Sequence, residues 1–299
     1  MSGRARVVMA APAKVNLYLG VGALRADGYH DVETVLHAIE LSDTVTLTTG
    51  RGVSLVADAP LGIPSEENLA YRAALALAEA VGRSPDVHIV LEKRIPAGAG
   101  LGGASSDAAA VLVGLPSLWG AKVADDALLA VATDLGADVP FFLEGGTALY
   151  GGRGDVFERR VEMAALDIVV VNVAEPVSTA RAYAVFDRLE LPPPPGARRM
   201  LQACETGSAA AIAPVLFNNM TDAATTIVPR IADALEWCRR QTGVAGCAVS
   251  GSGSAVFAVC ASPGAAHDVA AAATRAGYWA CATRSSSVGV RRQVEGNGP

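Results

Sequence analysis

Four glycines in six residues, within the segment IPAGAGLGGASSDAAA (95–110), constrain the fold of this chain more than any other feature. The segment follows a predicted strand and leads into a predicted alanine-rich helix. Glycine lets the backbone turn tightly and lets its N–H groups approach a ligand closely. The start of a helix adds unpaired N–H groups and about half a positive charge. A phosphate-binding loop and a plain glycine-rich turn both fit the segment taken alone.

Other well-known phosphate-binding motifs fit this segment poorly. A Walker A loop needs a lysine after the glycines, and none follows here. Gly98, Gly100 and Gly103 nearly meet the dinucleotide pattern GxGxxG. The strand before them is not the first of the chain, however, and no acidic residue ends a strand about 20 positions later. The protein-kinase loop lacks its HRD and DFG partner motifs.

Length and composition favour a folded enzyme-sized protein. With 299 residues, 51% of them hydrophobic, the chain can bury two cores or one large core. Charged residues make up 18%, which is too apolar a mixture for general disorder. The net charge of -6 provides no overall basic surface, so no nucleic-acid partner is predicted. No stretch approaches the ~18 apolar residues of a membrane span, so no membrane partner is predicted either.

The cysteines and histidines do not form a recognisable metal or disulfide pattern. The cysteines contain no CxxC pair, lie in the last third of the chain and have mostly apolar neighbours, which predicts reduced core thiols in a cytoplasmic protein. The histidines show no HxxxH or HExxH spacing, so no zinc site is predicted. The residues are Cys204, Cys238, Cys247, Cys260, Cys281, His30, His37, His88 and His267.

Strands dominate the N-terminal part of the sequence. Residues 5–57 are rich in β-branched and aromatic residues with turn signals between them. A helix is predicted from a cap at Ser65 to a stop at Gly82, followed by a strand at 87–93. The helix after the glycine-rich segment is predicted to end before Pro116.

The remainder mixes helices and strands. The expected elements are a helix at 125–136, a hairpin at 145–155, a strand at 166–173, a helix at 178–189, a proline-rich loop at 191–196, two or three helices in 197–241, a strand, glycine turn and strand at 246–260, a helix at 263–276, strands near 279–291 and a frayed tail at 294–299. Strands come first as a group and do not alternate regularly with helices. This order predicts an α+β fold with two lobes rather than a doubly wound sheet.

Three segments together resemble the GHMP kinases, the superfamily of galactokinase, homoserine kinase, mevalonate kinase and phosphomevalonate kinase. PAKVNLYL (12–19) is similar to the first motif of that superfamily, PxxxGLGGASSD (96–107) to the second and GCAVSGSGSAVFAV (246–259) to the third. The resemblance implies an N-terminal lobe similar to ribosomal protein S5 domain 2 (1–160) and a ferredoxin-like C-terminal lobe (161–299). It also implies transfer of a phosphoryl group from ATP to a substrate hydroxyl in the cleft between the lobes.

Two segments, 12–45 and 135–155, narrow the resemblance to one branch of the superfamily. That branch phosphorylates 4-diphosphocytidyl-2-C-methyl-D-erythritol to its 2-phosphate in the non-mevalonate (methylerythritol phosphate) isoprenoid pathway. The implied partner is a small molecule linked to cytidine diphosphate, and the chain is expected to act as a monomer or weak dimer. ATP and Mg²⁺ are the implied cofactors, with Mg²⁺ arriving on the nucleotide. The glutamate that holds Mg²⁺ in some GHMP kinases has no evident counterpart here.

Two residues match the catalytic pair of this family. Asp138 in LGADVP matches the base, which accepts the proton of an alcohol as it attacks. Lys14 in PAKVN matches a lysine that holds the aspartate and stabilises the transferring phosphoryl group. Without the resemblance, the sequence predicts that Asp138 caps a helix before Pro140 and that Lys14 is a surface lysine at the edge of a strand. The apolar surroundings of Lys14 argue against the second of these alternatives.

The resemblance places substrate contacts at Asn16, Tyr29 and His30, where His30 bonds the cytosine edge and Tyr29 stacks on the ring. In VSTARAY it places a polar contact at Thr179 and a second ring at Tyr183, with Phe186 as a competitor for that ring. Without the resemblance, Tyr29 and His30 fit an ordinary turn, and the ring of Tyr183 or of Phe186 fits the buried face of a helix.

A second glycine turn, SGSGS, is expected near the substrate phosphates through Gly251, Ser252 and Gly253, although a β-hairpin loop is the usual meaning of such a run. The implied ATP-binding residues are Asn68, Pro96, Ala97, Gly98, Ala99, Gly100, Leu101, Gly102, Gly103, Ala104, Ser105 and Ser106. First-turn helix packing is the alternative for Asn68. Asp107 would repel phosphate if it faced inward, so its side chain is predicted to point away or to act through Mg²⁺.

Three other functions stay open at this point. Another GHMP kinase would need no cytosine site. A catalytically dead sensor of the same fold would lack Lys14 or Asp138, and both are present. A dinucleotide-dependent oxidoreductase would have to bind NAD(P).

Overall fold

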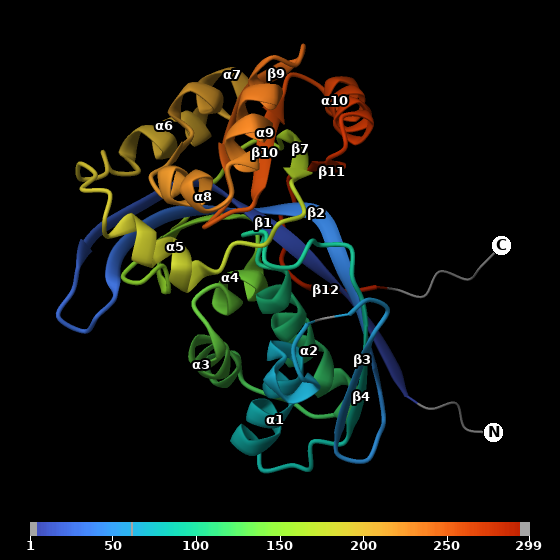
Figure 1. Cartoon of the computed structure of the whole chain (residues 1–299). Helices are drawn as coiled ribbons and strands as arrows, with labels where there is room; N and C mark the ends of the chain where they lie inside the picture. Colours follow the sequence, from blue (N-terminus) through green and yellow to red (C-terminus); the bar gives the residue numbers. More distant parts are fainter. Residues whose placement is uncertain (1–4, 61, 294–299) are drawn as a thin grey trace.

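The structure, a computed structural model, describes residues 5–60 and 62–293. Over these residues the chain forms an eight-stranded sheet and a four-stranded sheet, with helices packed on both. Helices α1 to α4 lie on one side of the long β1–β2 ribbon, and α6 to α10 lie on the other (Figure 1). The α+β prediction is therefore confirmed. The frayed tail predicted at 294–299 lies outside the described residues.

The first sheet is built on two nineteen-residue strands, β1 and β2, which pair antiparallel along most of their length. Its order is β12-β1-β2-β4-β3, with β5 also on β2, β6 on β5 and β8 on β1. The strands are β1 (Arg6–Leu24), β2 (His30–Thr48), β3 (Val53–Ala57), β4 (Val87–Glu92), β5 (Thr147–Gly151), β6 (Val156–Arg160), β8 (Phe217–Asn218) and β12 (Arg291–Arg292). The hairpin predicted at 145–155 contains β5 and the turn after it, and its second strand, β6, lies just beyond that segment.

The second sheet has the order β11-β7-β10-β9, with every pair antiparallel. Its strands are β7 (Asp167–Asn172), β9 (Val244–Val249), β10 (Ala255–Cys260) and β11 (Trp279–Arg284). The helices are α1 (Leu69–Ala80), α2 (Gly103–Trp119), α3 (Asp125–Leu135), α4 (Val139–Glu144), α5 (Thr179–Phe186), α6 (Arg198–Thr206), α7 (Ala209–Ile212), α8 (Thr221–Ile227), α9 (Arg230–Arg239) and α10 (Pro263–Arg275). Two 3₁₀ turns lie at Ser65–Glu67 and Ala213–Val215. None of the described helices is long and apolar enough to cross a membrane.

Three apolar cores hold these layers together. The first lies between the large sheet and helices α1, α2 and α4, around Leu47, Leu77 and Phe142. The second joins the two sheets, with Val15 of β1 and Phe257 of β10 among its members. The third lies between the small sheet and helices α8, α9 and α10. Because apolar side chains of β1 reach both the first and the second core, this strand is buried on both faces, as an almost continuous apolar run predicts.

Three sequence expectations about helices were wrong. Ser65 does not cap α1, because residues 65–67 form a separate 3₁₀ turn and the Asn68 side chain accepts the N–H of Ala70 at 2.8 Å instead. Helix α2 does not end before Pro116 but continues to Trp119, where Gly120 ends it with a φ of 60°. Burial of Leu115 and Leu118 against the first core offsets the hydrogen bond that proline lacks. Residues 197–241 hold four α-helices rather than two or three.

The proposed lobe boundary at residue 160 falls at the end of β6. Two strands from beyond it nevertheless join the first sheet. Tyr18 of β1 pairs with Phe217 of β8, and Met9 pairs with Arg292 of β12. None of the five cysteines is paired in a disulfide; Cys204, Cys238 and Cys260 are buried as predicted, whereas Cys247 and Cys281 are half-buried.

Candidate active site

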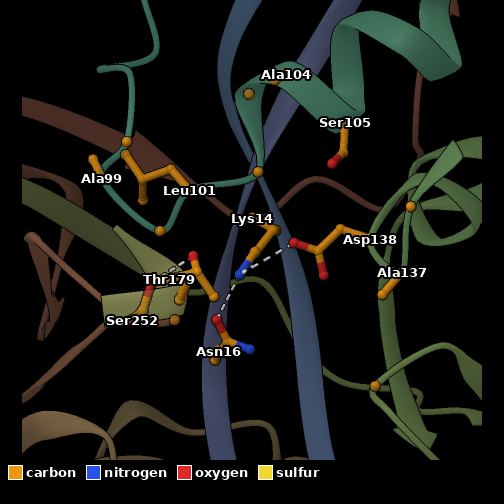
Figure 2. Close-up of a pocket in the computed structure, with 18 of the residues that line it drawn as sticks. Lys14, Asn16, Ala99, Leu101, Ala104, Ser105, Ala137, Asp138, Thr179 and Ser252 are labelled. Atoms are coloured by element: carbon orange, nitrogen blue, oxygen red, sulfur yellow. Dashed lines mark hydrogen bonds and ion pairs between the residues drawn. The ribbon is translucent and has the colours of Figure 1, made fainter. Parts of the chain in front are cut away.

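A cavity of about 1080 Å³ is lined by residues of the first sheet, of the glycine-rich loop, of helix α5 and of the turn between β9 and β10. Lys14 rises from β1 at its centre, with the loop on one side, Asp138 on another and Thr179 and Ser252 opposite (Figure 2). Lys14 and Asn16 point into the cavity together, because side chains two apart on a strand share a face. The cavity thus gathers residues that lie more than 200 positions apart in the sequence.

The glycine-rich loop is held in a shape that only glycine can adopt at two of its positions. Gly100 has a φ of 76°, and a Cβ there would lie 2.0 Å from the carbonyl oxygen of Ser250. Gly102 has a φ of 72°, and a Cβ there would lie 2.6 Å from the Phe142 ring and 3.1 Å from Lys14 Cγ. The loop backbone therefore lies directly against the second glycine turn and against Lys14.

The start of helix α2 faces the cavity without a side-chain cap. Gly102 occupies the cap position and makes no side-chain hydrogen bond, whereas Asn68, Ser178 and Ser262 cap α1, α5 and α10. An uncapped helix start with its partial positive charge is a binding site for an anion such as phosphate.

Nearly all of the proposed ATP-binding residues line this cavity. They are Asn68, Pro96, Ala97, Gly98, Ala99, Gly100, Leu101, Gly102, Gly103, Ala104 and Ser105. Ser106 is fully buried and does not line it, and its hydroxyl has no partner among the described residues. Asn68 caps α1 and also lines the cavity, so holding the start of that helix does not remove it from the proposed nucleotide site.

Lys14 and Asp138 form an ion pair in the cavity, with 3.8 Å between Nζ and Oδ2. The Lys14 side chain is 5% exposed and that of Asp138 is 36% exposed. Lys14 Nζ also donates to Asn16 Oδ1 at 2.7 Å, as the dashed lines of Figure 2 show. Its backbone N–H donates to the carbonyl of Leu101, which fixes β1 to the glycine-rich loop. Lys14 is therefore not the surface lysine of the alternative interpretation.

Asp138 precedes α4 at its cap position, yet its side chain makes no cap hydrogen bond. The helix-cap alternative is therefore wrong for the side chain, which instead lies toward Lys14. Burial raises the pKa of the nearby Tyr183 phenol, and the Asp138 carboxylate raises it further.

Tyr29, His30 and Tyr183 form one end of the cavity. Tyr29 is 54% exposed, and the Arg153 guanidinium lies 4.8 Å from its ring centroid. His30 and Tyr183 stack with ring centroids 5.3 Å apart. Phe186 meets the edge of His30 at 5.7 Å but does not line the cavity. The structure thus presents Tyr29 and Tyr183, and not Phe186, as rings open to a ligand.

Both ring nitrogens of His30 already have partners. Nδ1 lies 2.9 Å from the carbonyl oxygen of Gly22, and Nε2 lies 2.9 Å from Asp187 Oδ1. The first contact holds the ring in place from its own hairpin, and the second comes from the end of α5. Asp187 also lines the cavity.

The second glycine turn borders the cavity through Gly251 and Ser252, while Gly253 does not line it. Ser252 Oγ lies 3.1 Å from Thr179 Oγ1, so the two hydroxyls predicted to contact the substrate are adjacent. Asn218 holds the turn by donating to the carbonyl of Gly251 at 2.8 Å.

Sequence reasoning missed Arg153 and Asp187, although both line the cavity. Arg153 lies in the run GGRGD, where an arginine flanked by glycines in a hairpin turn was a usable signal. Asp187 lies near the end of the helix predicted at 178–189 and carries no local pattern. Asp107 was predicted to point away from the phosphates or to act through Mg²⁺. It lines the cavity, and its Oδ2 lies 2.5 Å from Lys93 Nζ.

Comparison with known proteins agrees with this architecture. Residues 68–146 match the family described as GHMP kinases N terminal domain, and residues 200–278 match GHMP kinases C terminal. The crystal structure of a homoserine kinase from Cytophaga hutchinsonii has a TM-score of 0.74 at 20% identity, covering 98% of this chain and 99% of that one, and shows the shared fold. The chain belongs to the GHMP kinases, which confirms the predicted two-lobed fold.

Two relatives define its place among them. A 4-diphosphocytidyl-2-C-methyl-D-erythritol kinase of Mycolicibacterium gilvum is 42% identical over 273 residues, covering 88% of this chain and 84% of that protein. A crystal structure of 4-(cytidine 5'-diphospho)-2C-methyl-D-erythritol kinase has a TM-score of 0.79 at 36% identity, covering 93% of this chain and 99% of that one. The chain is a member of the 4-diphosphocytidyl-2-C-methyl-D-erythritol kinase family, and the prediction that it is a kinase is confirmed.

Proposed function

We propose that this kinase transfers the γ-phosphoryl group of ATP to a hydroxyl of 4-diphosphocytidyl-2-C-methyl-D-erythritol, giving the 2-phosphate in the non-mevalonate isoprenoid pathway. The observation that carries the proposal is the Lys14–Asp138 ion pair at 3.8 Å, in the same cavity as the glycine-rich loop. The loop supplies a place for the triphosphate, and the ion pair supplies a base and a cation beside it.

In the proposed step, the substrate hydroxyl loses its proton to the Asp138 carboxylate while its oxygen attacks the γ-phosphorus. The new O–P bond forms as the bond to the β–γ bridging oxygen breaks, and ADP leaves. Lys14 faces the transferring group with its charge and is held by Asn16 Oδ1 at 2.7 Å. Most of the acceleration in phosphoryl transfer comes from such positioning and charge stabilisation.

The ring cluster supports a cytosine at the other end of the cavity. Tyr29 and Tyr183 each present an aromatic ring to the cavity, and the His30 ring stacks on that of Tyr183. The carbonyl oxygen of Gly22 already occupies Nδ1 of His30, so His30 can bond the cytosine only through Nε2. In this proposal the cytosine replaces Asp187 as the partner of Nε2. Stacking between a base and a side-chain ring contributes about 1–3 kcal/mol.

Mg²⁺ is proposed to arrive with ATP and to bind chiefly through phosphate oxygens. Within the described residues, no cluster of three or more His, Cys, Asp or Glu side chains could hold a metal ion. The oxygen donors that line the phosphate end of the cavity include Ser105 and Asp138, a set that suits a cation already bound to a nucleotide. Mg²⁺ would neutralise charge on the triphosphate there.

The proposal is tested by ATP consumption with purified protein and Mg²⁺, offered 4-diphosphocytidyl-2-C-methyl-D-erythritol, homoserine, mevalonate and galactose in turn. The expected result is turnover of the cytidyl substrate alone, with a product heavier by one phosphate in mass spectrometry. Turnover of another substrate, without turnover of the cytidyl substrate, would contradict the assignment of the ring cluster to the cytosine. Binding of ATP without turnover of any substrate would favour a sensor, and binding of NAD(P) would favour an oxidoreductase.

Cellular location and assembly belong to the same proposal. We propose a cytoplasmic enzyme that acts as a monomer or weak dimer on a small molecule. Cell fractionation and sedimentation across a range of protein concentrations test these two points.

A further inference from the structure

Three charged side chains meet beneath the glycine-rich loop and take no part in the step proposed above. Asp43 lies on β2, is fully buried and does not line the cavity. Lys93 follows β4 and Asp107 lies one turn into α2, and both of these residues line the cavity. Lys93 Nζ donates to Asp107 Oδ2 at 2.5 Å and also to Asp43 Oδ2. One lysine therefore joins two carboxylates that come from different elements.

Asp43 holds the strand side of the loop through its other oxygen. Its Oδ1 accepts the backbone N–H of Arg94 at 2.6 Å and that of Ile95 at 2.8 Å. These N–H groups come immediately before Pro96, where the cavity-lining loop begins. Three hydrogen bonds thus converge on one buried carboxylate, an arrangement that orients a backbone strongly.

The helix side of the loop is attached to the same cluster. Asp107 lies one turn into α2, and Lys93 links it to Asp43. The two ends of the loop also touch, because a Cβ on Gly103 would lie 3.0 Å from Ile95 Cγ2 and 3.4 Å from Asp43 Oδ2. The loop from Pro96 to Gly102 therefore begins and ends at one point.

The cluster carries more acid than base. Burial raises the pKa of Asp107 to about 7, with Lys93 acting in the opposite direction. Its Oδ1 is buried without a hydrogen-bond partner among the described residues. Loss of the negative charge is therefore expected to disturb the cluster less at Asp107 than at Asp43, because both carboxylate oxygens of Asp43 accept hydrogen bonds.

We propose that Asp43, Lys93 and Asp107 form a clasp that fixes the two ends of the glycine-rich loop, and that Asp43 is a positioning residue for ATP. The inference rests on the proposed function in one respect, namely that this loop binds the triphosphate. A loop whose ends are fixed before the ligand arrives loses less conformational entropy on binding. Asp43 acts through the backbone of 94–103 and lies below the cavity rather than in it.

The test measures binding of a non-hydrolysable ATP analogue with Mg²⁺ by titration calorimetry. Asp43→Asn and Lys93→Met are each expected to raise Kd for the analogue by about tenfold or more, and the double variant to be no more than about twofold weaker than the weaker single variant. Asp107→Asn keeps an oxygen acceptor for Lys93 and is expected to stay within about threefold of the wild type. Kd for the cytidyl substrate is expected to stay within about twofold in all of them.

Asp58→Asn is the matched control. Asp58 is exposed and accepts the backbone N–H of Lys93 at 2.9 Å, so it touches the same residue without reaching the loop. Amide hydrogen exchange of the free protein gives a readout independent of binding. Exchange over 97–105 is expected to be faster in Asp43→Asn and unchanged in Asp58→Asn, whereas a purely structural role would accelerate exchange throughout the first sheet.

Wild-type protein that fails to bind the analogue overturns the proposed function, and the clasp with it. Wild-type binding together with an unchanged Kd in Asp43→Asn overturns the clasp alone. Additive losses in the double variant also overturn it, because they would show that Asp43 and Lys93 act separately. If Asp43→Asn does not fold, Lys93→Met takes its place, and exchange over 97–105 in the free protein decides, because Lys93 also lines the cavity. A raised Kd with unchanged exchange in Lys93→Met would overturn the clasp.

Discussion

Gly100 and Ser250 join the two glycine turns of this kinase. Ser250 Oγ donates to the carbonyl of Gly100 at 2.9 Å, and a Cβ on Gly100 would lie 2.0 Å from the Ser250 carbonyl oxygen. The proposed triphosphate loop and the proposed substrate turn therefore share one backbone contact, and neither can move far without the other.

Gly100→Ala is expected to separate the two turns. The Cβ meets backbone rather than a flexible side chain, and alanine at a φ of 76° adds about 1–2 kcal/mol of strain. We expect Kd for an ATP analogue to rise by about tenfold or more, measured by calorimetry. Gly82→Ala is the control, because Gly82 has a φ of 64° with nothing within 4 Å of the added Cβ. Equal effects of the two changes on ATP binding would show that the contact between the turns is unimportant.

Asp138→Asn is expected to abolish most of the turnover while leaving ATP binding intact. The amide keeps the shape of the side chain but cannot take the hydroxyl proton, and a positioned base contributes about 100-fold to 10,000-fold. The measurement is kcat at saturating ATP and cytidyl substrate. Asp134→Asn serves for comparison, since Asp134 lines the same cavity four residues earlier and is exposed. A kcat in Asp138→Asn near that of Asp134→Asn would remove the base from the mechanism.

Tyr29→Ala is expected to raise KM for the cytidyl substrate by about 5-fold to 100-fold, with KM for ATP unchanged, because a stacking face of about 1–3 kcal/mol is lost. Steady-state kinetics with each substrate varied in turn measures both constants. Phe157→Ala provides a control of equal exposure, since both rings are 54% exposed and Phe157 does not line the cavity. An unchanged KM for the cytidyl substrate in Tyr29→Ala would contradict the assignment of the cytosine site.

His37 is expected to make the fold sensitive to acid. Burial lowers its pKa from 6.5 to about 4, and its nitrogens lie 2.7 Å from the hydroxyls of Thr147 and Ser285. Between these two values the unfolded chain binds a proton that the folded protein refuses, so stability falls as pH falls. The loss over that window is about 3 kcal/mol.

The measurement for His37 is urea unfolding at several pH values, in the wild type and in His37→Gln. Because many carboxylates titrate in the same range, only the difference between the two proteins isolates this histidine. We expect the wild type to lose about 3 kcal/mol more than the variant on acidification. Parallel pH dependences would show that His37 keeps an ordinary pKa in the folded protein.

The elements with local signals could be predicted from the sequence, and those that depend on distant contacts could not. Segments rich in β-branched residues predicted strands where β1, β2 and β7 lie, and the resemblance of three motifs to the GHMP kinases indicated the fold. Pro116 looked like a helix end because its local rule holds only where tertiary burial does not offset it. Asn68 displaced Ser65 as the cap because both are good caps and only the path of the chain decides between them.

The site residues, like the elements of the fold, could be predicted where a local motif marks them and could not where they depend on distant contacts. Lys14 and Asp138 lie 124 positions apart, and only the family resemblance suggested that they meet. Asp43 and Lys93 have no family motif around them, and their pairing depends on the register of β2 against β4, where Thr44 lies opposite Glu92. Arg153, which lies over the Tyr29 ring, and Asp187, which lies beside Nε2 of His30, likewise became visible only when the hairpins and α5 were placed in space.

The pairing of β12 with β1 affects how the protein can be synthesised. A ribosome releases β1 first, yet Arg291, Arg292 and Gln293 supply the groups that pair with Val8, Met9 and Ala10. Until those residues emerge, this part of β1 keeps an open edge, and an unpaired strand edge invites association with other chains. A chain truncated before β12 would keep the exposed edge of a nascent polypeptide for its whole lifetime.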